Sequence, residues 1–382
     1  MKAVWALPAG PRVLVVSPMA SHPPFAGNSA RLLAFNRELM LRGARVDLLY
    51  YGMEGLTSQA ERAMRAAWHE FIFVPSLPPA KQSFATHWGI DDWCPDELCA
   101  AIEQHTSRHT YDAIVVNYSW MSRVFEFCDI PLKILDTHDV FADRRDKMVR
   151  AALEPRWFFT SASEEAKAFS RADIVIGIQD SETGLIAQRS ASRVLTVGHP
   201  PDLSFLGGAP STVPAVLFGY FASGNPWNKR SISALDAELS GQPRIDWVIA
   251  GTICDSSIIF NAAPLKLGRL SQPADFYEHV CCVINPMIGG TGLKIKTIEA
   301  LSYGKPVIGT VPSFEGLSSV HPFHSFNSIA DMACGMQDYA ASASLQTEIA
   351  EASRELAVGY AADVAAQFDE LFDVIKETSR GY

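Results

Sequence analysis

Short apolar runs alternate with amphipathic segments from residue 12 onward, and this alternation limits the possible folds more than any other feature. Before residue 200 the runs fall at 13–17, 46–50, 113–117, 133–136, 173–178 and 193–197. A helical pattern over 28–42 places Leu32, Phe35 and Leu39 on one face and stops at Gly43. Buried strands interleaved with helices are typical of a parallel sheet covered on both faces. The pattern predicts a Rossmann-like domain over residues 1–200.

The same alternation restarts after a stretch rich in glycine, proline and serine at 207–214. Predicted strands follow at 215–220, 247–251, 265–268, 282–286 and 306–310, and the end of the chain reads as helices. A chain of 382 residues is too long for one ordinary core. We expect an α/β fold with a second Rossmann-like domain over 201–360, and a last helix over 361–382 that packs back toward the first domain. Two doubly wound domains facing a central cleft bind their ligands in that cleft.

Composition excludes several classes of protein. A net charge of −10 does not suit a nucleic-acid-binding protein, which needs an excess of lysine and arginine. Seven cysteines without a C-x-x-C pair indicate neither a zinc framework nor a disulfide set. The apolar stretch at 4–7 is too short for a signal peptide, and no apolar run reaches the roughly 18 residues of a membrane span. We expect a cytoplasmic protein that would meet any membrane from its surface.

The segment at 289–310 carries the strongest functional signal, GGTGLKIKTIEALSYGKPVIGT. A glycine-rich turn leaves an apolar strand and brings Lys294 and Lys296 into a helix that holds Glu299. Glycines let the backbone approach a phosphate, and the amides and dipole of the helix start attract the anion. The segment therefore predicts a site for a phosphorylated ligand. The alternative is that the glycines serve only to pack the start of the helix.

Neighbouring positions extend this prediction from a phosphate to a nucleotide. Ser223 lies in a small-residue loop after the first strand of the second domain, and Arg269 and Leu270 follow its third strand, where a flat base could be seated. Glu299 is expected two turns into its helix, where a carboxylate can accept from both hydroxyls of a ribose. The alternative is a surface ion pair between Lys296 and Glu299, which are three residues apart.

Residues 290–307 resemble the donor-site segment of retaining GT-B glycosyltransferases, and more closely a branch of the family 4-like enzymes with the pattern GTGxKxKxxEA. The resemblance extends to Gly219, Asn228 and Gly268 and to residues 315–317, and so covers most of 215–320. The first domain matches more loosely, through 24–27 and 136–141.

The resemblance implies a nucleoside-diphosphate sugar bound mainly by the second domain and an acceptor bound mainly by the first. Glu299 would hold the ribose, and Lys294 or Lys296 would supply charge to the leaving group. The other donor-binding positions implied or predicted are Gly27, Asn28, Gly219, Ser223, Asn228, Arg269, Leu270, Gly290, Thr291, Gly292 and Leu293. Gly27 and Asn28 would line the cleft beside the transferred sugar, and His138 would lie near the reacting sugar.

One position departs from the family pattern. The broader family has a glutamate eight positions before the ribose-binding glutamate, and this chain has Thr291 there. The sugar contacts would then rely more on backbone amides around Thr291 and Gly292. The departure leaves the identity of the sugar open.

The chain contains no Asp-x-Asp sequence, with which many transferases of the other main fold hold a metal. Cleavage of the anomeric C–O bond leaves a nucleoside diphosphate whose growing negative charge must be stabilised. We expect lysines and a helix N-terminus to do this, with no metal and no cofactor. Retention of configuration and a place in polysaccharide or glycoconjugate biosynthesis follow from the resemblance alone.

His138, flanked by Asp136 and Asp139 at the end of a strand, is a candidate general base. The alternative is a histidine that orders its loop by hydrogen bonding. Asp139 is a second catalytic candidate, and an ion pair between Asp139 and Arg144 explains it equally well.

Basic residues are interleaved with aromatic ones at 144–159, including Arg144 and Arg145, and Trp88 lies in a proline-bounded loop. These residues could contact a lipid-diphosphate acceptor or an anionic membrane surface. The alternative is a solvated helix whose aromatic neighbours pack on the sheet.

Two other functions remain open. A GT-B nucleotide-sugar epimerase would need further carboxylates, and a non-catalytic nucleotide-sugar-binding partner subunit would fit the loss of glutamate at Thr291. A Rossmann dehydrogenase is not indicated, because the first strand is followed by residues 18–28 with one glycine rather than a dinucleotide-binding fingerprint.

Overall fold

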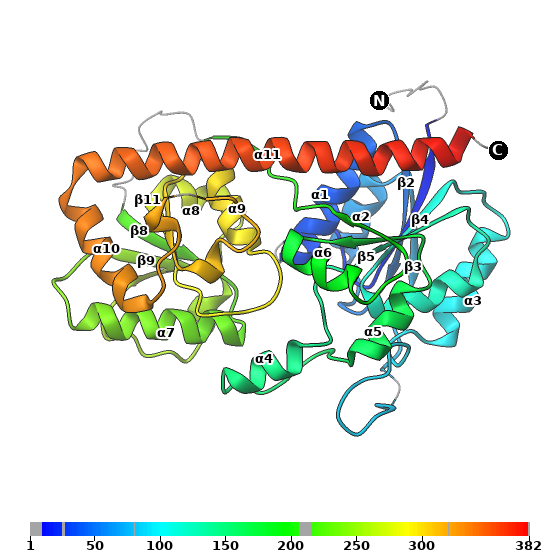
Figure 1. Ribbon diagram of the computed structural model, residues 1–382, viewed down its shortest axis with the longest axis horizontal. Helices are drawn as coiled ribbons and strands as arrows, with labels where there is room; N and C mark the ends of the chain where they lie inside the picture. Colours follow the sequence, from blue (N-terminus) through cyan, green and yellow to red (C-terminus); the bar gives the residue numbers. More distant parts are fainter. Residues whose placement is uncertain (1–9, 25–26, 80, 206–215, 320, 381–382) are drawn as a thin grey trace. The chain divides into compact units, whose positions relative to one another are not determined.

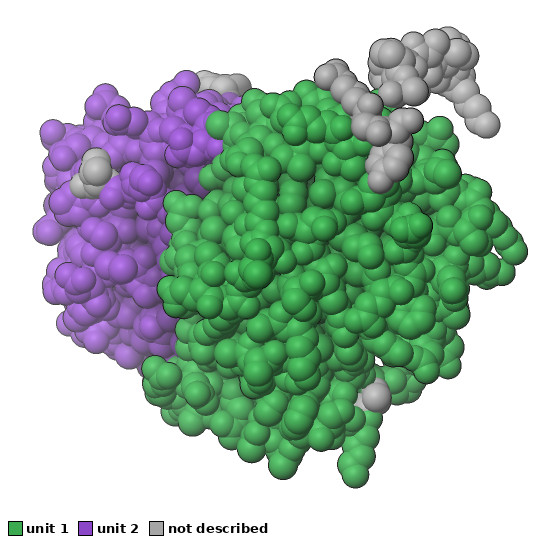
Figure 2. Space-filling view, turned by 45° about the vertical axis from the view of Figure 1, so that its right-hand side comes forward, with its two compact units in different colours: residues 1–200, 364–382 green, residues 201–363 purple. Residues whose placement is uncertain are grey.

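The computed structural model describes residues 10–24, 27–79, 81–205, 216–319 and 321–380. The chain forms two compact units (Figure 2). Unit 1 comprises residues 1–200 and 364–382, and unit 2 comprises residues 201–363. The predicted connection at 207–214 lies outside the described residues.

Unit 1 is built on one parallel sheet. Its strands are β1 (Arg12–Ser17), β2 (Arg45–Tyr51), β3 (Glu70–Val74), β4 (Ala113–Asn117), β5 (Leu132–Asp136), β6 (Ile174–Gly177) and β7 (Arg193–Thr196). They pair in the order β3-β2-β1-β4-β5-β6-β7. The chain thus begins at β1 inside the sheet, adds β2 and β3 on one side, and then adds β4 to β7 on the other side. Val13 to Val16 of β1 and Ala113 to Val116 of β4 are completely buried, as both faces of such a sheet require.

Helices connect these strands (Figure 1). They are α1 (Gly27–Leu41), α2 (Ser58–Ala67), α3 (Asp96–Thr106), the 3-10 helix η1 (Ser119–Phe127), α4 (Arg144–Arg150), α5 (Ala162–Phe169) and α6 (Asp180–Ala187). The predicted face of α1 is confirmed, since Leu32, Phe35 and Leu39 are buried. Gly43 follows the helix with φ of 103°, a conformation that suits glycine after a helix end.

Unit 2 repeats this plan on a smaller scale. Its strands are β8 (Val216–Phe221), β9 (Trp247–Ala250), β10 (Leu265–Gly268), β11 (Val280–Asn285) and β12 (Val307–Gly309), paired in parallel in the order β10-β9-β8-β11-β12. Its helical segments are α7 (Pro226–Ser240), η2 (Thr252–Asp255), α8 (Pro273–His279), α9 (Ile295–Ser302), η3 (Val311–Ser313), η4 (Pro322–His324) and α10 (Ile329–Ala341).

One long helix, α11 (Ala343–Arg380), contributes to both units (Figure 1). In unit 2 its Leu356 and Ala357 join the core formed by β11, β12 and their helices. In unit 1 the ring of Phe368 lies 5.1 Å from that of Phe35, edge to face. Residues 361–380 of the last helix expected over 361–382 therefore lie in a helix that begins at Ala343, and 381–382 lie outside the described residues.

The predicted α/β fold with two parallel sheets is confirmed. The predicted strands agree with those of the structure to within two residues at their ends, and β3 is the strand that was not predicted. Among the described residues, none of the helices combines the length and apolar character that crossing a bilayer requires.

Candidate functional site

The glycine turn between β11 and α9 has the backbone that only glycine adopts readily. Gly290 has φ of 128° and Gly292 has φ of 69°. Gly289 has a different role, because a Cβ there would lie 2.8 Å from the ring of Trp227. The packing alternative therefore holds for Gly289, whereas Gly290 and Gly292 shape the loop.

Helix α9 begins at Ile295, with Lys294 as its N-terminal cap residue. The prediction that Glu299 lies two turns into the helix is wrong, because it is the fifth residue of α9, a little more than one turn from the start. The carboxylate is therefore closer to the glycine turn than expected.

Lys294 is buried, at 8% exposure, although it carries an ammonium group. Its Nζ donates to the carbonyl oxygen of Gly292 and lies 3.6 Å from Oε2 of Glu315, which is 42% exposed. The ammonium is thus held under the glycine turn, and its anionic partner lies on the solvent side. An incoming anion can compete with Glu315 for this charge.

Lys296 takes a different set of partners. Its Nζ donates to Oδ1 of Asn228 at 2.7 Å and to the hydroxyl of Tyr220 at 3.1 Å, and it lies 3.1 Å from Sδ of Met287. Burial, and then the charge of Lys294, hold the pKa of Lys296 well below its usual value. The three N–H groups of Lys296 are directed at protein atoms, so its ammonium would act on a bound anion through charge rather than through a direct bond.

Lys296 donates to Asn228 and Tyr220, and no ion pair joins it to Glu299 in the described part of the chain, so the alternative of a surface ion pair is not supported. Burial raises the pKa of Glu299 to about 7, and interaction with the hydroxyl of Tyr277 opposes the shift. The Tyr277 ring is buried and stacks on that of Tyr303 at 4.4 Å. Glu299 is therefore a poorly solvated carboxylate one helical turn from the two lysines.

Buried polar contacts fix the frame of the turn. Nδ2 of Asn285, at the end of β11, donates to Oγ1 of Thr297 at 2.7 Å, and that hydroxyl donates to the carbonyl oxygen of Ser313 at 2.7 Å. The Thr310 hydroxyl donates to the carbonyl oxygen of Met287. Side chains on both flanking strands thus hold the loop in place.

Two of the other predicted donor residues come together beside Lys296. Nδ2 of Asn228 donates to the carbonyl oxygen of Ser223 at 2.9 Å while its Oδ1 accepts from Lys296. Gly219 lies within β8, where a Cβ would approach Val280 at 2.5 Å and Phe276 at 2.6 Å. Close packing explains that glycine without a ligand.

Arg269 and Leu270 follow β10. Nε of Arg269 donates to Oδ2 of Asp255 at 2.8 Å, and the Arg269 side chain is 71% exposed. Leu270 is half-buried against the unit 2 core. Their predicted contact with a base stays a prediction.

In unit 1, two adjacent strands end in strained residues. Tyr118 after β4 has φ of 74°, and His138 after β5 has φ of 60°. Their rings stack with centroids 4.2 Å apart and planes 17° from parallel. Positive φ in a bulky residue costs energy and is concentrated at functional sites. The pair marks the carboxyl ends of the central strands as a candidate site.

The partners of His138 fix its protonation. Nδ2 of Asn117 donates to the carbonyl oxygen of Val16 at 3.0 Å, so its Oδ1 is the atom that accepts from Nε2 of His138 at 2.8 Å. The hydrogen is therefore on Nε2, and Nδ1 holds the lone pair. Burial, and then the charge of Arg31, lower the pKa of His138 to about 4 despite the nearby carboxylate of Asp136. At neutral pH the imidazole is uncharged and only weakly basic.

A buried ion pair underlies this cluster. Nε and Nη2 of Arg31 donate to the two carboxylate oxygens of Asp136 at 3.0 and 2.9 Å. Burial raises the pKa of Asp136, but Arg31 and His138 outweigh it and hold the pKa below its usual value. Arg31 also donates to the carbonyl oxygens of Val197 and Gly198. Arg31, Asn117 and Tyr118 were not predicted as site residues, because only the folded chain brings them to His138.

The predicted Asn28 joins this cluster. Its side chain interacts with the hydroxyl of Tyr118, and its Oδ1 accepts from the backbone N–H of Ser29 at 2.9 Å. Gly27 is the exposed first residue of α1. The structure thus brings Asn28 and His138 together through Tyr118.

The remaining predicted residues of unit 1 are engaged in structure. Nη1 of Arg144 lies 3.5 Å from Oδ2 of Asp139, and the guanidinium lies over the ring of Trp157 at 5.3 Å. Arg145 is exposed, 3.5 Å from Asp146. Trp88 packs edge to face on Trp93 at 5.6 Å. The alternatives of an ion pair for Asp139 and of packing for the aromatic residues account for these contacts.

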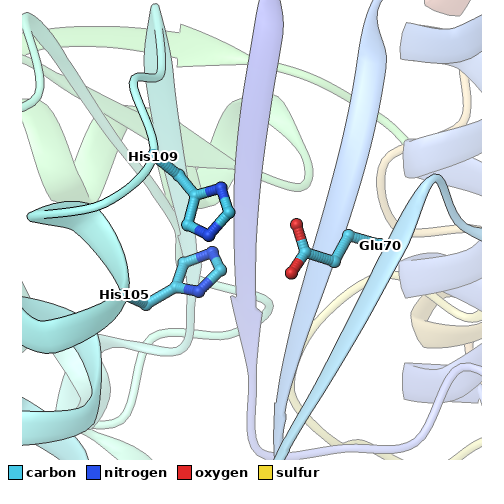
Figure 3. A group of neighbouring side chains, drawn as sticks. All are labelled: Glu70, His105 and His109. Carbon is cyan, nitrogen blue, oxygen red and sulfur yellow. The ribbon is translucent and has the colours of Figure 1, made fainter.

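Among the described residues, one group of three has the donors to hold a metal ion, namely Glu70, His105 and His109 (Figure 3). Glu70 begins β3, and the two histidines lie at the end of α3 and in the following turn. The group lies at the amino ends of the unit 1 strands, whereas Tyr118 and His138 lie at the carboxyl ends.

No protein-family model and no curated protein matches the sequence. Solved structures do match over nearly the whole chain. A sucrose-phosphate synthase from Thermosynechococcus elongatus is 15% identical with a TM-score of 0.73, covering 96% of this chain and 99% of that one. HepE from Anabaena in complex with UDP-glucose is 13% identical with a TM-score of 0.68, covering 95% and 100%.

The structure of TarM is also similar, at 9% identity with a TM-score of 0.70, covering 95% of this chain and 98% of that one. At such identities the likeness establishes the fold rather than the reaction. The chain has the GT-B fold of these glycosyltransferases.

Proposed function

We propose that the chain is a glycosyltransferase that moves a sugar from a nucleoside-diphosphate donor to a glycan or lipid-linked acceptor, in polysaccharide or glycoconjugate biosynthesis. The observation that carries the proposal lies within unit 2. A turn with two glycines of positive φ, two lysines with poorly solvated ammonium groups and a half-buried carboxylate lie within ten residues, 290–299. The UDP-glucose bound to HepE supports a nucleotide sugar as the donor.

Each group has a role in holding the donor. The diphosphate would lie at the glycine turn and the start of α9, where backbone amides and the helix dipole favour an anion. The ammonium of Lys294 would exchange Glu315 for a phosphate oxygen, and Lys296 would add charge behind it. Ionised Glu299 would accept from the ribose hydroxyls.

The proposed reaction proceeds with retention of configuration. The anomeric C–O bond breaks and its electron pair passes to the diphosphate oxygen, while the acceptor oxygen bonds to the same face of the anomeric carbon. The acceptor proton passes to the departing diphosphate oxygen. Poorly solvated lysines stabilise that oxygen more strongly than lysines in water would.

Unit 1 would bind the acceptor and orient the sugar. Because His138 is neutral with its lone pair on Nδ1, we assign it hydrogen bonding to a sugar hydroxyl rather than proton abstraction, with Asn28 beside it. Asp139, expected as a catalytic residue, would then hold the loop through Arg144. Arg145 and Trp88 stay candidates for contact with the acceptor or with the inner membrane surface.

A non-catalytic nucleotide-sugar-binding subunit is the second candidate, and Thr291 at the position of the family glutamate favours it. The two candidates share the donor site and differ in turnover. No additional cluster of carboxylates beside Glu299 in the described part of unit 2 supports an epimerase.

The test has two stages. A thermal-shift screen with UDP, GDP, dTDP and ADP sugars should reveal one donor that raises the melting temperature, because a ligand of the native state stabilises it by mass action. Release of nucleoside diphosphate from that donor, with acceptor glycans present, should then be detected for the wild type and lost in Glu299→Ala. A rise in melting temperature without release of nucleoside diphosphate would favour the non-catalytic subunit. If no donor raises the melting temperature, the proposed donor site is wrong.

A further inference from the structure

We propose that Glu70, His105 and His109 bind a single divalent cation of the late transition series, Zn²⁺ above all. The site lies at the side of the unit 1 sheet where the strands have their amino ends. The site shares no residue with the donor site, so neither proposal depends on the other. Its argument rests on geometry, on the hydrogen bonds behind the ligands and on the local balance of charge.

The three side chains face one another from separate elements (Figure 3). Their potential ligand atoms all lie within 4.8 Å of one another. The rings of His105 and His109 are stacked, with centroids 4.5 Å apart and planes 19° from parallel. A tetrahedral zinc about 2.1 Å from each ligand needs ligand atoms roughly 3.4 Å apart. Side-chain rotations that shorten the separations by no more than about 1.4 Å therefore complete the site.

The hydrogen bonds behind His105 prepare it as a ligand. The hydroxyl of Tyr111 donates to Oδ2 of Asp47 at 2.8 Å, so its oxygen accepts from Nε2 of His105 at 2.7 Å. This leaves the lone pair of His105 on Nδ1. Metal-binding histidines are commonly oriented in this way, through the other ring nitrogen and a carboxylate.

The charges around the trio favour a cation. Arg12 is a positive side chain close to the trio, and it is bound to Asp47, with an Nη2 to Glu70 Oε2 distance of 3.2 Å. Asp112 accepts from the backbone N–H of Arg12 at 2.7 Å. Two carboxylates, those of Asp47 and Glu70, thus contact one guanidinium, and a third, that of Asp112, accepts from the main chain of the same residue. The carboxyl end of α3, beside His105, adds the negative end of a helix dipole.

His69, the other histidine at this edge, has its Nδ1 2.7 Å from Oδ1 of Asp47. It faces Asp47 rather than the trio.

The ligand set selects the metal. Two imidazoles and one carboxylate suit Zn²⁺ and its neighbours, whereas Mg²⁺ and Ca²⁺ require oxygen ligands. Three protein ligands leave a fourth position for water. A bound ion would tie the edge strand β3 to α3, because it bridges Glu70 to the two histidines.

The test uses the full-length protein, freed of metal by EDTA and then dialysed. Titration with ZnCl₂ against a chromogenic chelator should show one equivalent bound, and MgCl₂ should not bind. His109→Gln should weaken zinc binding at least tenfold, and Tyr111→Phe by about tenfold through the orientation of His105. Circular dichroism without metal verifies that each variant is folded.

His87→Ala is the control, since it removes a histidine of unit 1 whose ring contacts Thr86 and Phe84 rather than the trio or Asp47. We expect its zinc affinity to stay within about twofold of the wild type. Absence of zinc binding, an unchanged affinity in His109→Gln, or an equal loss in His87→Ala would each overturn the site. Release of nucleoside diphosphate by His109→Gln should match the wild type, which separates this test from that of the donor site.

Discussion

The glycine turn of unit 2 and the histidine cluster of unit 1 occupy equivalent positions, at the carboxyl ends of parallel strands, yet they differ in chemistry. The turn of unit 2 holds two ammonium groups and a carboxylate that are poorly solvated. The cluster of unit 1 presents a neutral imidazole on an aromatic stack, with its ion pair of Arg31 and Asp136 buried beneath. The first arrangement is suited to hold and stabilise an anion, and the second to orient neutral hydroxyl groups.

If the turn stabilises the leaving diphosphate, Lys294→Ala should cause the largest loss. We expect kcat to fall by about 10² to 10³, the usual effect of removing a group that stabilises charge in the transition state. Lys266→Ala is the control, because Lys266 is an exposed lysine of unit 2 over the ring of Phe260. Steady-state kinetics of both variants decide the point, and equal rates for the two would contradict the role of Lys294.

Glu299 should show the next largest effect. Glu299→Gln removes the ionised acceptor for the ribose and should weaken nucleotide binding by roughly 10- to 100-fold. Because the pKa of Glu299 is about 7, it ionises as the pH rises through that value. The affinity of the wild type should then increase about tenfold from pH 6 to pH 8. Calorimetry at several pH values tests this prediction. If the nucleotide affinity of Glu299→Gln changes with pH as that of the wild type does, the pH dependence belongs to another group.

His138 should affect turnover but not nucleotide binding. His138→Ala should lower kcat by about tenfold, since one oriented hydrogen bond is lost, while the dissociation constant of the nucleotide stays unchanged. With a pKa of about 4 the imidazole is neutral from pH 6 to pH 9, so the wild-type rate should show no step near pH 6.5 caused by this residue. If the wild-type rate shows a step near pH 6.5 that disappears in His138→Ala, His138 acts as a general base after all.

The backbone of the glycine turn should contribute a smaller, local effect. Gly290→Ala should destabilise the protein by about 1 kcal/mol, because alanine is strained at φ of 128°. Gly359→Ala, in the middle of α11 with open space around its Cα, should instead stabilise it by about 0.5–1 kcal/mol. Urea denaturation of both measures the difference, and equal effects would remove the conformational argument for the turn.

Metal removal should have the smallest effect on transfer. We expect the initial rate at 25 °C to be unchanged by EDTA, because in the proposed reaction ammonium groups and a helix start would take the place of a metal at the diphosphate. The control is the same assay with His109→Gln, which lacks a ligand of the proposed zinc site. Loss of activity in EDTA for both proteins would place a metal in the reaction itself.

The features that could be predicted from the sequence are those encoded by neighbouring residues. The buried strands are continuous apolar runs, and the segment 289–310 carries its glycines, lysines and carboxylate within one stretch. Strand β3 was not predicted because it is a short strand at the edge of the sheet, and Phe71 is its only buried residue. The start of α9 was placed too early, since the turn extends through Lys294.

Contacts between distant residues could not be predicted in the same way. Lys296 donates to Tyr220 of β8 and Asn228 of α7. Because both partners are distant in sequence, the spacing of Lys296 and Glu299 alone could not exclude a surface ion pair between them. His138 owes its protonation to Asn117 and Arg31, which lie on other elements. A single sequence shows the residue types but not which of them become buried together.

The most direct test of the central claim compares the two regions by nucleotide affinity. The nucleoside diphosphate of the donor selected by thermal shift is titrated calorimetrically into the wild type, Lys294→Ala and His138→Ala. We predict about a tenfold or greater loss of affinity in Lys294→Ala, from the lost charge-assisted contact, and no more than about a twofold change in His138→Ala. Equal affinities in all three proteins, or a loss confined to His138→Ala, would contradict a donor site on the glycine turn of unit 2.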